Sequence, residues 1–126
     1  MAYILAVDDD TDTLNLVARI LESRGHRVVT ALDGQEALDA IFREPPDAVI
    51  LDLNLPRVHG FEVCRRLKND PATSGIPIIM LTAAYPTVED AARGLNMGAD
   101  GYVVKPFLRD VLIGNVERLL VAMPIS

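Results

Sequence analysis

The segment AVIL at residues 48–51, followed at once by Asp52, decides the fold of this chain. A short, continuous apolar run that contains β-branched residues is typical of a strand buried on both faces of a sheet. Comparable runs occur at residues 3–7, 28–30, 76–81 and 101–104. The sequence therefore predicts five buried strands.

Helical patterns fill the intervals between these runs. Within residues 11–24, one helical face carries the apolar residues Leu14, Val17, Ala18 and Leu21. Further helices are predicted after a capping box at Asp33 and Glu36, and over residues 60–69, 87–95 and 108–120. Strands that alternate with helices indicate an α/β fold, with a parallel sheet covered by helices on both sides.

Charged and hydroxyl side chains end four of the predicted strands. They are Asp8, Asp9 and Asp10 after the first strand, Asp52 after the third, Thr82 after the fourth and Lys105 after the fifth. Right-handed crossovers bring the carboxyl ends of parallel strands to one edge of the sheet, where ligands bind. Clustered carboxylates need a cation, and hard oxygen ligands suit Mg²⁺, Ca²⁺ or Mn²⁺. A carboxylate nucleophile, a cation and a lysine together indicate phosphoryl transfer.

Each of these residues also has an ordinary structural explanation. Acidic residues ahead of a helix stabilise its N-terminus, and we expect Asp10 and Asp12 to do no more than that. An Asp after a strand is commonly a turn residue. Thr82 or Lys105 alone would not indicate a site. The functional prediction depends on the combination, in which four strand ends carry residues suited to one chemistry.

These segments resemble the receiver domains of response regulators in bacterial two-component signalling. The resemblance extends from Ile4 to Leu120, and its motifs are LAVDDD at residues 5–10, VILDLNLP at 49–56, Gly60, LTA at 81–83, GAD at 98–100 and KPF at 105–107. It implies a flavodoxin-like, doubly wound, five-stranded parallel sheet of order 2-1-3-4-5, flanked by five helices. Residues 1–126 would form a single receiver domain.

The resemblance implies a role for each acidic residue. Asp52 resembles the phosphoacceptor, which takes a phosphoryl group from a phosphohistidine of a sensor histidine kinase or a histidine phosphotransfer protein. Asp9 resembles a direct metal ligand and Asp8 a ligand that acts mainly through water, and Asn54 would offer its backbone carbonyl. The expected metal is Mg²⁺, or Mn²⁺ in its place. Such a domain catalyses only its own phosphorylation and dephosphorylation.

The resemblance also implies phosphate-binding and switching groups. Thr82, the Ala83 backbone N–H and Lys105 would contact phosphoryl oxygens, and the bond between Lys105 and Pro106 is expected to be cis. Tyr102 resembles the switch aromatic residue that turns inward when Thr82 moves toward the phosphate. The face made by the fourth helix, fifth strand and fifth helix would then repack and bind a downstream target or a tethered output domain, or form a dimer.

Some residues depart from the common pattern of the family or lie outside its motifs. His59 precedes Gly60 where receivers often have Asp, and we expect it to be a loop residue near the site entrance, with a metal or proton role as the less favoured alternative. His26, in the turn before the second strand, is expected to have no functional role. Cys64 is expected to pack as a small hydrophobic residue.

The composition limits the partners and the compartment. The 126 residues carry a net charge of −6 without a cluster of Lys and Arg, so we expect no direct binding to nucleic acid. The single cysteine, Cys64, excludes an intrachain disulfide and fits a reducing compartment. The N-terminus has no signal-peptide pattern, and no apolar run approaches the roughly 20 residues that span a bilayer. We therefore expect a cytoplasmic protein that does not contact a membrane.

Three alternatives compete with this interpretation. A phosphatase of the haloacid dehalogenase type also uses an Asp nucleophile, a hydroxyl, a lysine and Mg²⁺, but it needs a second Asp where this chain has Asn54. A non-phosphorylated, receiver-like interaction module would usually have lost one of the key residues, and this chain retains them all. A flavodoxin would need a hydroxyl- and glycine-rich loop after the first strand, where the Asp cluster lies instead.

Overall fold

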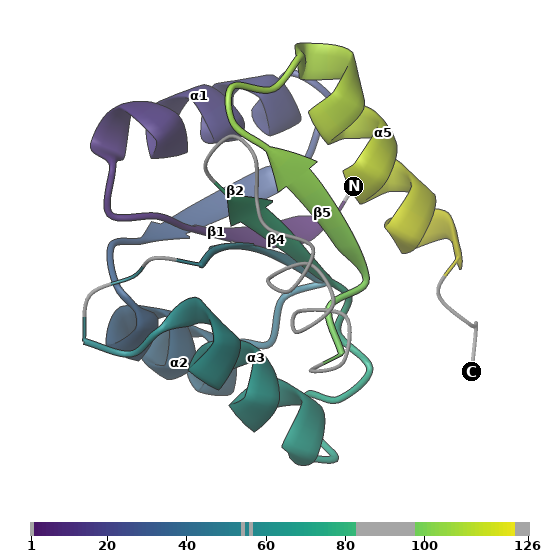
Figure 1. Ribbon diagram of the computed structural model, residues 1–126. Coiled ribbons are helices and arrows are strands. Elements are labelled where there is room, and N and C mark those ends of the chain that lie inside the picture. Colours follow the sequence, from purple (N-terminus) through teal and green to yellow (C-terminus); the bar gives the residue numbers. More distant parts are fainter. Residues whose placement is uncertain (1, 54, 56, 83–97, 123–126) are drawn as a thin grey trace.

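The computed structural model describes residues 2–53, 55, 57–82 and 98–122, and its strands form one parallel sheet. The strands are β1 (Tyr3–Val7), β2 (Arg27–Ala31), β3 (Ala48–Asp52), β4 (Ile78–Thr82) and β5 (Gly101–Val104). They are ordered β2-β1-β3-β4-β5, and every neighbouring pair is parallel. The predicted five-stranded sheet and its order 2-1-3-4-5 are confirmed (Figure 1).

Helices cover both faces of this sheet. The described helices are α1 (Thr11–Glu22), α2 (Gly34–Arg43), α3 (Gly60–Asn69) and α5 (Arg109–Ala122). Figure 1 shows α1 and α5 on one face and α2 and α3 on the other. The helix predicted over residues 87–95 lies outside the described residues. Within the described part of the chain, no helix combines the length and the apolar character needed to pass through a bilayer.

One strand begins later than its apolar run. The run starts at Ile76, but β4 starts at Ile78. The backbone N–H of Ile76 donates to the Thr73 carbonyl in the preceding turn, and Pro77 has no N–H to donate. The turn and the proline therefore delay the strand by two residues.

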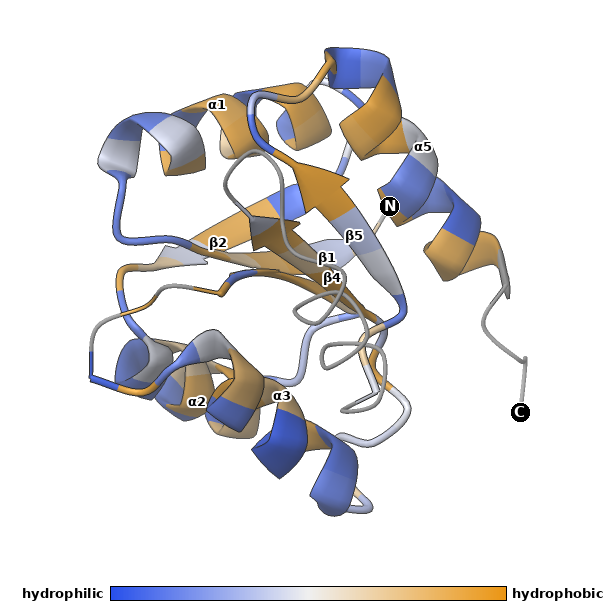
Figure 2. Ribbon diagram, viewed as in Figure 1, coloured by the Kyte–Doolittle hydropathy of each residue, from blue (hydrophilic) through white to orange (hydrophobic). Residues whose placement is uncertain are grey.

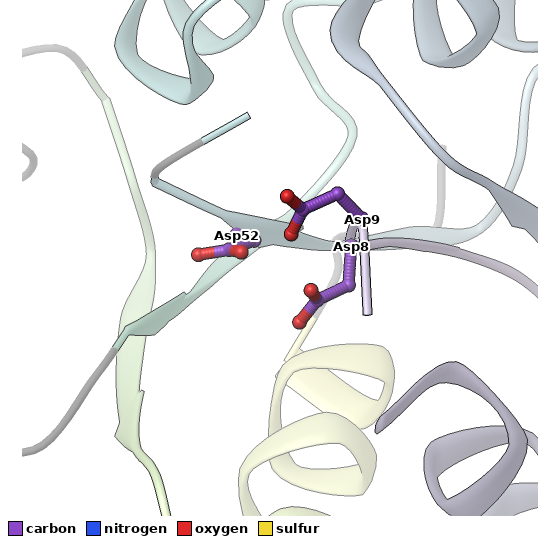
Figure 3. A group of neighbouring side chains, drawn as sticks. All are labelled: Asp8, Asp9 and Asp52. Atoms are coloured by element: carbon purple, nitrogen blue, oxygen red, sulfur yellow. The ribbon is translucent and has the colours of Figure 1, made fainter. Parts of the chain in front are cut away.

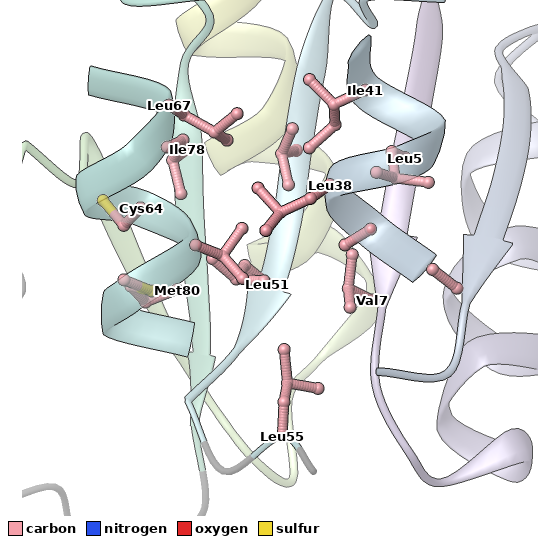
Figure 4. Close-up of a cluster of buried hydrophobic side chains, with 14 of the residues drawn as sticks. Leu5, Val7, Leu38, Ile41, Leu51, Leu55, Cys64, Leu67, Ile78 and Met80 are labelled. Atoms are coloured by element: carbon pink, nitrogen blue, oxygen red, sulfur yellow. The ribbon is translucent and has the colours of Figure 1, made fainter. Parts of the chain in front are cut away.

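The sheet separates two hydrophobic layers. Every residue of β3 and β4 is buried, as expected for strands covered on both faces. Successive side chains point to opposite faces, so Leu51 packs with α2 and α3, while Ile50 packs with α1 and α5. Figure 4 shows the layer that contains Leu38 and Leu67, and Figure 2 shows the apolar sides of the helices directed at the sheet. Each fully buried aliphatic side chain contributes about 1.5–3 kcal/mol, and together these layers fix the strand ends in space.

Carboxylates determine where two helices begin. The Asp10 carboxylate caps α1 and accepts the Thr13 hydroxyl at 2.7 Å. The Asp33 carboxylate caps α2 and accepts the Glu36 N–H at 2.8 Å, and the Glu36 carboxylate accepts the Leu32 N–H at 3.3 Å. The predicted capping box is confirmed, except that its returning hydrogen bond comes from Leu32 and not from the cap residue.

Gly34, the first residue of α2, lies against the loop that precedes α3. A Cβ on Gly34 would be 2.0 Å from the Val58 carbonyl oxygen and 2.6 Å from the Val58 Cβ. Both distances are far shorter than van der Waals contact, so the close approach of α2 to this loop requires glycine.

We predict opposite effects for two Gly-to-Ala substitutions in helices. Gly34→Ala should lower the free energy of unfolding by about 1–3 kcal/mol, because the new methyl group would overlap a backbone carbonyl. Gly114→Ala should raise it by about 0.5–1 kcal/mol, because Gly114 lies exposed in α5 with no atom near the new Cβ. Urea unfolding followed by circular dichroism measures both. Equal effects would contradict the close contact at Gly34.

Candidate functional site

Three carboxylates meet at the carboxyl edge of the sheet. Val7 of β1 pairs with Leu51 of β3, so the next residues, Asp8 and Asp52, come side by side. One oxygen each of Asp8, Asp9 and Asp52 lies within 4.8 Å of the others, and Figure 3 shows the three carboxylates gathered together. Asp8 is 0% exposed and Asp52 is 5% exposed, whereas Asp9 is exposed. The convergence predicted for these three residues is therefore present.

Lys105 brings a positive charge to this group. Its Nζ lies 2.6 Å from Asp8 Oδ2 and 3.7 Å from Asp52 Oδ2. Burial lowers the pKa of Lys105, but the hydrogen bond to Asp8 and the charges of Asp52 and Asp8 outweigh burial and raise the pKa above its ordinary value of 10.5. The ammonium is therefore charged at neutral pH. The expected cis bond between Lys105 and Pro106 is also present.

Backbone contacts hold the buried Asp8 in place. Its N–H donates to the Ala31 carbonyl of β2 at 3.1 Å, and its Oδ1 accepts the Asp10 N–H at 2.9 Å. With the ammonium of Lys105 on Oδ2, both carboxylate oxygens have a donor. These donors satisfy the hydrogen-bonding capacity of a carboxylate that would be costly to bury without partners.

The start of α3 supports the strand end that carries Asp52. A Cβ on Gly60 would be 2.4 Å from the Asp52 carbonyl oxygen and 2.9 Å from the Leu53 Cα, and the Gly60 N–H donates to the Leu53 carbonyl at 3.1 Å. Arg57, with φ of 67°, contacts Asp33 at 3.3 Å through Nη1. Arg57, the residue before Val58, is thus linked to the start of α2, and Gly60 packs the start of α3 against the strand end that carries Asp52.

His59 has a defined role that sequence reasoning missed. It was expected to be a loop residue, but it is the N-cap of α3, with Nδ1 accepting the Phe61 N–H at 3.2 Å. Histidine is not among the residues that favour this position, so its type gives little signal. Cys64 is 0% exposed within the core, as expected, and burial raises the pKa of its thiol to about 11.

Of the four remaining predicted site residues, Thr82 and Tyr102 are described by the structure. Thr82 ends β4, is 5% exposed, and accepts the Lys105 N–H at 2.7 Å through its backbone carbonyl. Tyr102 lies in β5, half-buried against the layer shared with α2 and α3. Asn54 and Ala83 lie outside the described residues. Asp8, Asp9, Asp52 and Lys105 are therefore gathered by the fold, and Thr82 is joined to Lys105 through the backbone.

The donor set fits a hard divalent cation. All three side chains offer carboxylate oxygens, which Mg²⁺, Ca²⁺ and Mn²⁺ prefer. Three carboxylates so close together repel one another, and a single ammonium offsets only part of that charge. A cation among them would complete the neutralisation. The group could hold a metal ion.

A doubly wound parallel sheet with an acidic group and a lysine at its carboxyl edge defines a flavodoxin-like α/β protein. The model of the response regulator receiver domain matches residues 4–117, and the chain belongs to this family. Family membership favours the receiver interpretation over a haloacid dehalogenase phosphatase or a flavodoxin.

Individual proteins that resemble this chain in sequence or structure are consistent with membership in this family. The DNA-binding dual master transcriptional regulator RpaA of Synechocystis sp. is 41% identical over 120 residues, which cover 95% of this chain and 49% of that protein. The signal receiver domain of a signal transduction histidine kinase from Syntrophus aciditrophicus has a TM-score of 0.92 and 32% identity, over 100% of this chain and 95% of that one. Chemotaxis response regulator CheY4 of Vibrio cholerae has a TM-score of 0.88 and 34% identity, over 94% and 98% of the two chains. The chain spans about half the length of the regulators that it matches in sequence.

The Lys105–Asp8 pair predicts a pH-dependent contribution to stability. Without divalent cations, Lys105→Met should lower the free energy of unfolding at pH 7 by about 1–3 kcal/mol. This is less than for a fully buried pair, because the ammonium remains 25% exposed. The pKa of Lys105 is higher in the folded protein than its unfolded value of 10.5, so the ion pair stabilises the fold fully below pH 10.5. This stabilisation is lost as the pH rises through the higher pKa of the folded state. The wild type should therefore lose its advantage over the variant in strong alkali.

Urea unfolding of both proteins across the pH range measures this difference. Arg118→Met is a suitable control, since Arg118 is exposed on α5, and it should change stability by less than about 0.5 kcal/mol. Equal stability of wild type and Lys105→Met at pH 7 would argue against the ion pair.

Proposed function

We propose that this chain accepts a phosphoryl group on Asp52 from a phosphohistidine, in a Mg²⁺-dependent reaction that switches a partner-binding face. The observation that carries the proposal is the group formed by Asp8, Asp9 and Asp52, with oxygens within 4.8 Å, beside the ammonium of Lys105. Membership in the receiver family supports it. Mg²⁺ or Mn²⁺, held by the three carboxylates and the Asn54 carbonyl, would neutralise charge on the phosphoryl oxygens.

The residues of the chain have separate tasks in this reaction. A carboxylate oxygen of Asp52 attacks phosphorus, the P–N bond of the donor breaks, and the imidazole leaves with its electron pair and takes up a proton. Burial of Asp52 limits access of water to the reacting atoms. Lys105, the Thr82 hydroxyl and the Ala83 N–H would bind the phosphoryl oxygens as charge develops on them. The product is an acyl phosphate, a reactive anhydride that later hydrolyses.

Phosphorylation would act as a population shift. The phosphoryl group favours whichever conformer brings Thr82 and Lys105 nearest to its oxygens, and it shifts the equilibrium only by that difference in contact energy. Tyr102, half-buried in β5, would turn inward behind Thr82. The neighbouring surface contains three exposed apolar residues, Val104, Leu108 and Val111. This exposed surface supports its use by a partner or by a second copy of the chain.

The partners that we propose follow from the family and from the relatives. The phosphoryl donor would be a sensor histidine kinase or a histidine phosphotransfer protein, in the cytoplasm. The output would be a separate protein target or a tethered domain. RpaA, whose name describes it as DNA-binding, supports a tethered domain of that kind, and direct contact of this receiver segment with nucleic acid is not proposed.

The first prediction from this function is phosphorylation of Asp52. After incubation with phosphoramidate or acetyl phosphate and Mg²⁺, intact-protein mass spectrometry should show one added phosphoryl group. EDTA should prevent the addition, because the carboxylates then lack the cation that neutralises the incoming group. Asp52→Asn should also prevent it.

A matched aspartate variant tests the specificity of this result. Asp39→Asn, on the exposed side of α2, should be labelled like the wild type, since Asp39 contacts Gln35 and lies outside the site. An unchanged mass for the wild type, under conditions that label a control receiver, would contradict the proposal. Full labelling of Asp52→Asn would contradict the assignment of the acceptor.

A second prediction concerns the metal. Asp9→Asn should weaken Mg²⁺ binding by at least about tenfold, because it removes one charged ligand from the group, and it should leave apo-protein stability nearly unchanged, because Asp9 is exposed. Asp12→Asn is the control and should bind Mg²⁺ like the wild type. Isothermal titration calorimetry measures both affinities. Equal affinity of Asp9→Asn and wild type would remove Asp9 from the ligand set.

A further inference from the structure

His59 holds the first turn of α3 through a ring nitrogen. Its Nδ1 accepts the Phe61 N–H at 3.2 Å, and its backbone carbonyl accepts the N–H groups of Glu62 and Val63 at 2.9 and 3.1 Å. The imidazole also stacks on the Phe61 ring, with centroids 5.3 Å apart. His59 is exposed, whereas Phe61 is 5% exposed. The cap is therefore anchored to the core and open to solvent on its other side.

Only the neutral imidazole can form this cap. Nδ1 accepts a hydrogen bond when it carries no proton, and both ring nitrogens are donors once the ring is protonated. A protonated ring would direct an N–H at the Phe61 N–H and place a positive charge at the positive end of the helix dipole. Protonation thus removes the cap and adds a repulsion.

The start of α3 is in direct contact with the acceptor strand. Gly60 follows the cap residue, and its Cα is so close to Asp52 that a Cβ would be 2.4 Å from the Asp52 carbonyl oxygen. On the other side, Val58 lies against Gly34, the first residue of α2. His59 therefore lies between two residues that make tightly packed contacts, Val58 with Gly34 and Gly60 with the Asp52 backbone.

We infer that His59 is a positioning residue for Asp52: its neutral ring holds the start of α3 against the acceptor strand, and acidification releases this support and slows phosphoryl uptake. The inference rests on the proposed phosphoacceptor function of Asp52. It adds a dependence on pH in the range where imidazole side chains change charge, about pH 5 to 8.

The charged groups around the cap come from its own loop, from α3 and from the carboxyl edge of the sheet. Arg57, in the same loop, pairs with Asp33 at the start of α2. Glu62, in the first turn of α3, pairs with Arg65 and Arg66, whose hydrogen bonds lower the pKa of Glu62 to about 2. The Asp8, Asp9 and Asp52 carboxylates and Lys105 lie at the carboxyl edge of the sheet, where the Asp52 backbone carbonyl packs against Gly60. His26 contacts Ala2 and Glu117, which belong to other parts of the fold.

The test compares rates of phosphoryl uptake from phosphoramidate at saturating Mg²⁺ between about pH 5.5 and 8. His59→Asn keeps an acceptor for the helix N–H at every pH, so it should match the wild type near pH 8. Near pH 5.5 the wild type should be slower than His59→Asn by about twofold to fivefold, which corresponds to about 0.4–1 kcal/mol in the barrier, no more than the stabilisation that an N-cap gives a helix. His59→Ala should be slower than His59→Asn by a ratio that does not vary with pH. Effects of pH on the donor and the metal cancel in these ratios.

The second histidine provides the control. His26→Asn should have the same pH profile as the wild type, and a profile changed as much as that of His59→Asn would overturn the inference. Coincident profiles of wild type and His59→Asn would overturn it as well.

Hydrogen exchange of the Phe61 amide separates this inference from the proposed function. Protection of that amide should fall on acidification in the wild type and stay constant in His59→Asn. If no variant is labelled at any pH, the phosphoacceptor function is wrong, and the amide still decides whether the cap titrates. Equal protection of Phe61 in both proteins across the range would refute the cap mechanism.

Discussion

The contact of 2.6 Å between the Lys105 ammonium and the fully buried Asp8 carboxylate is the interaction on which the site depends. A buried carboxylate without a partner is strongly unfavourable, so a counter-charge must be present wherever Asp8 is. Asp8 follows β1 and Lys105 follows β5, and β3 and β4 lie between these strands. The pair can form only when four strands have assembled in this order, which links the electrostatics of the site to the completeness of the sheet.

Sequence reasoning succeeded where local pattern and sheet geometry were sufficient. The buried run at residues 48–51 predicts a strand, and parallel strands bring their carboxyl ends to one edge, where Asp8 and Asp52 are neighbours because β1 pairs with β3. The order of the strands came from the family resemblance, because apolar periodicity carries no information about which strands are adjacent. The start of β4 was missed by two residues, because the Ile76 N–H is taken by a turn that the apolar run does not reveal.

The finer arrangement of the site required coordinates. Lys105 was expected to contact phosphate, and its partner in this structure is Asp8, a contact between residues 97 positions apart that no local pattern encodes. His59 was not expected to cap α3, since the bond to the Phe61 N–H depends on ring orientation. Gly60 was recognised only as part of a motif. Its contact with the Asp52 carbonyl explains why this position must lack a side chain.

The burial of Cys64 has a practical consequence for studies of motion in this protein. It is the only cysteine of the chain, it is 0% exposed, and burial raises the pKa of its thiol to about 11, so it contains almost no thiolate at neutral pH. Maleimide and similar reagents attack the thiolate. A cysteine introduced on the surface, for example at the exposed Val104 of β5, would therefore be modified selectively in the native background, and a spin label or fluorophore could be attached there without first replacing Cys64.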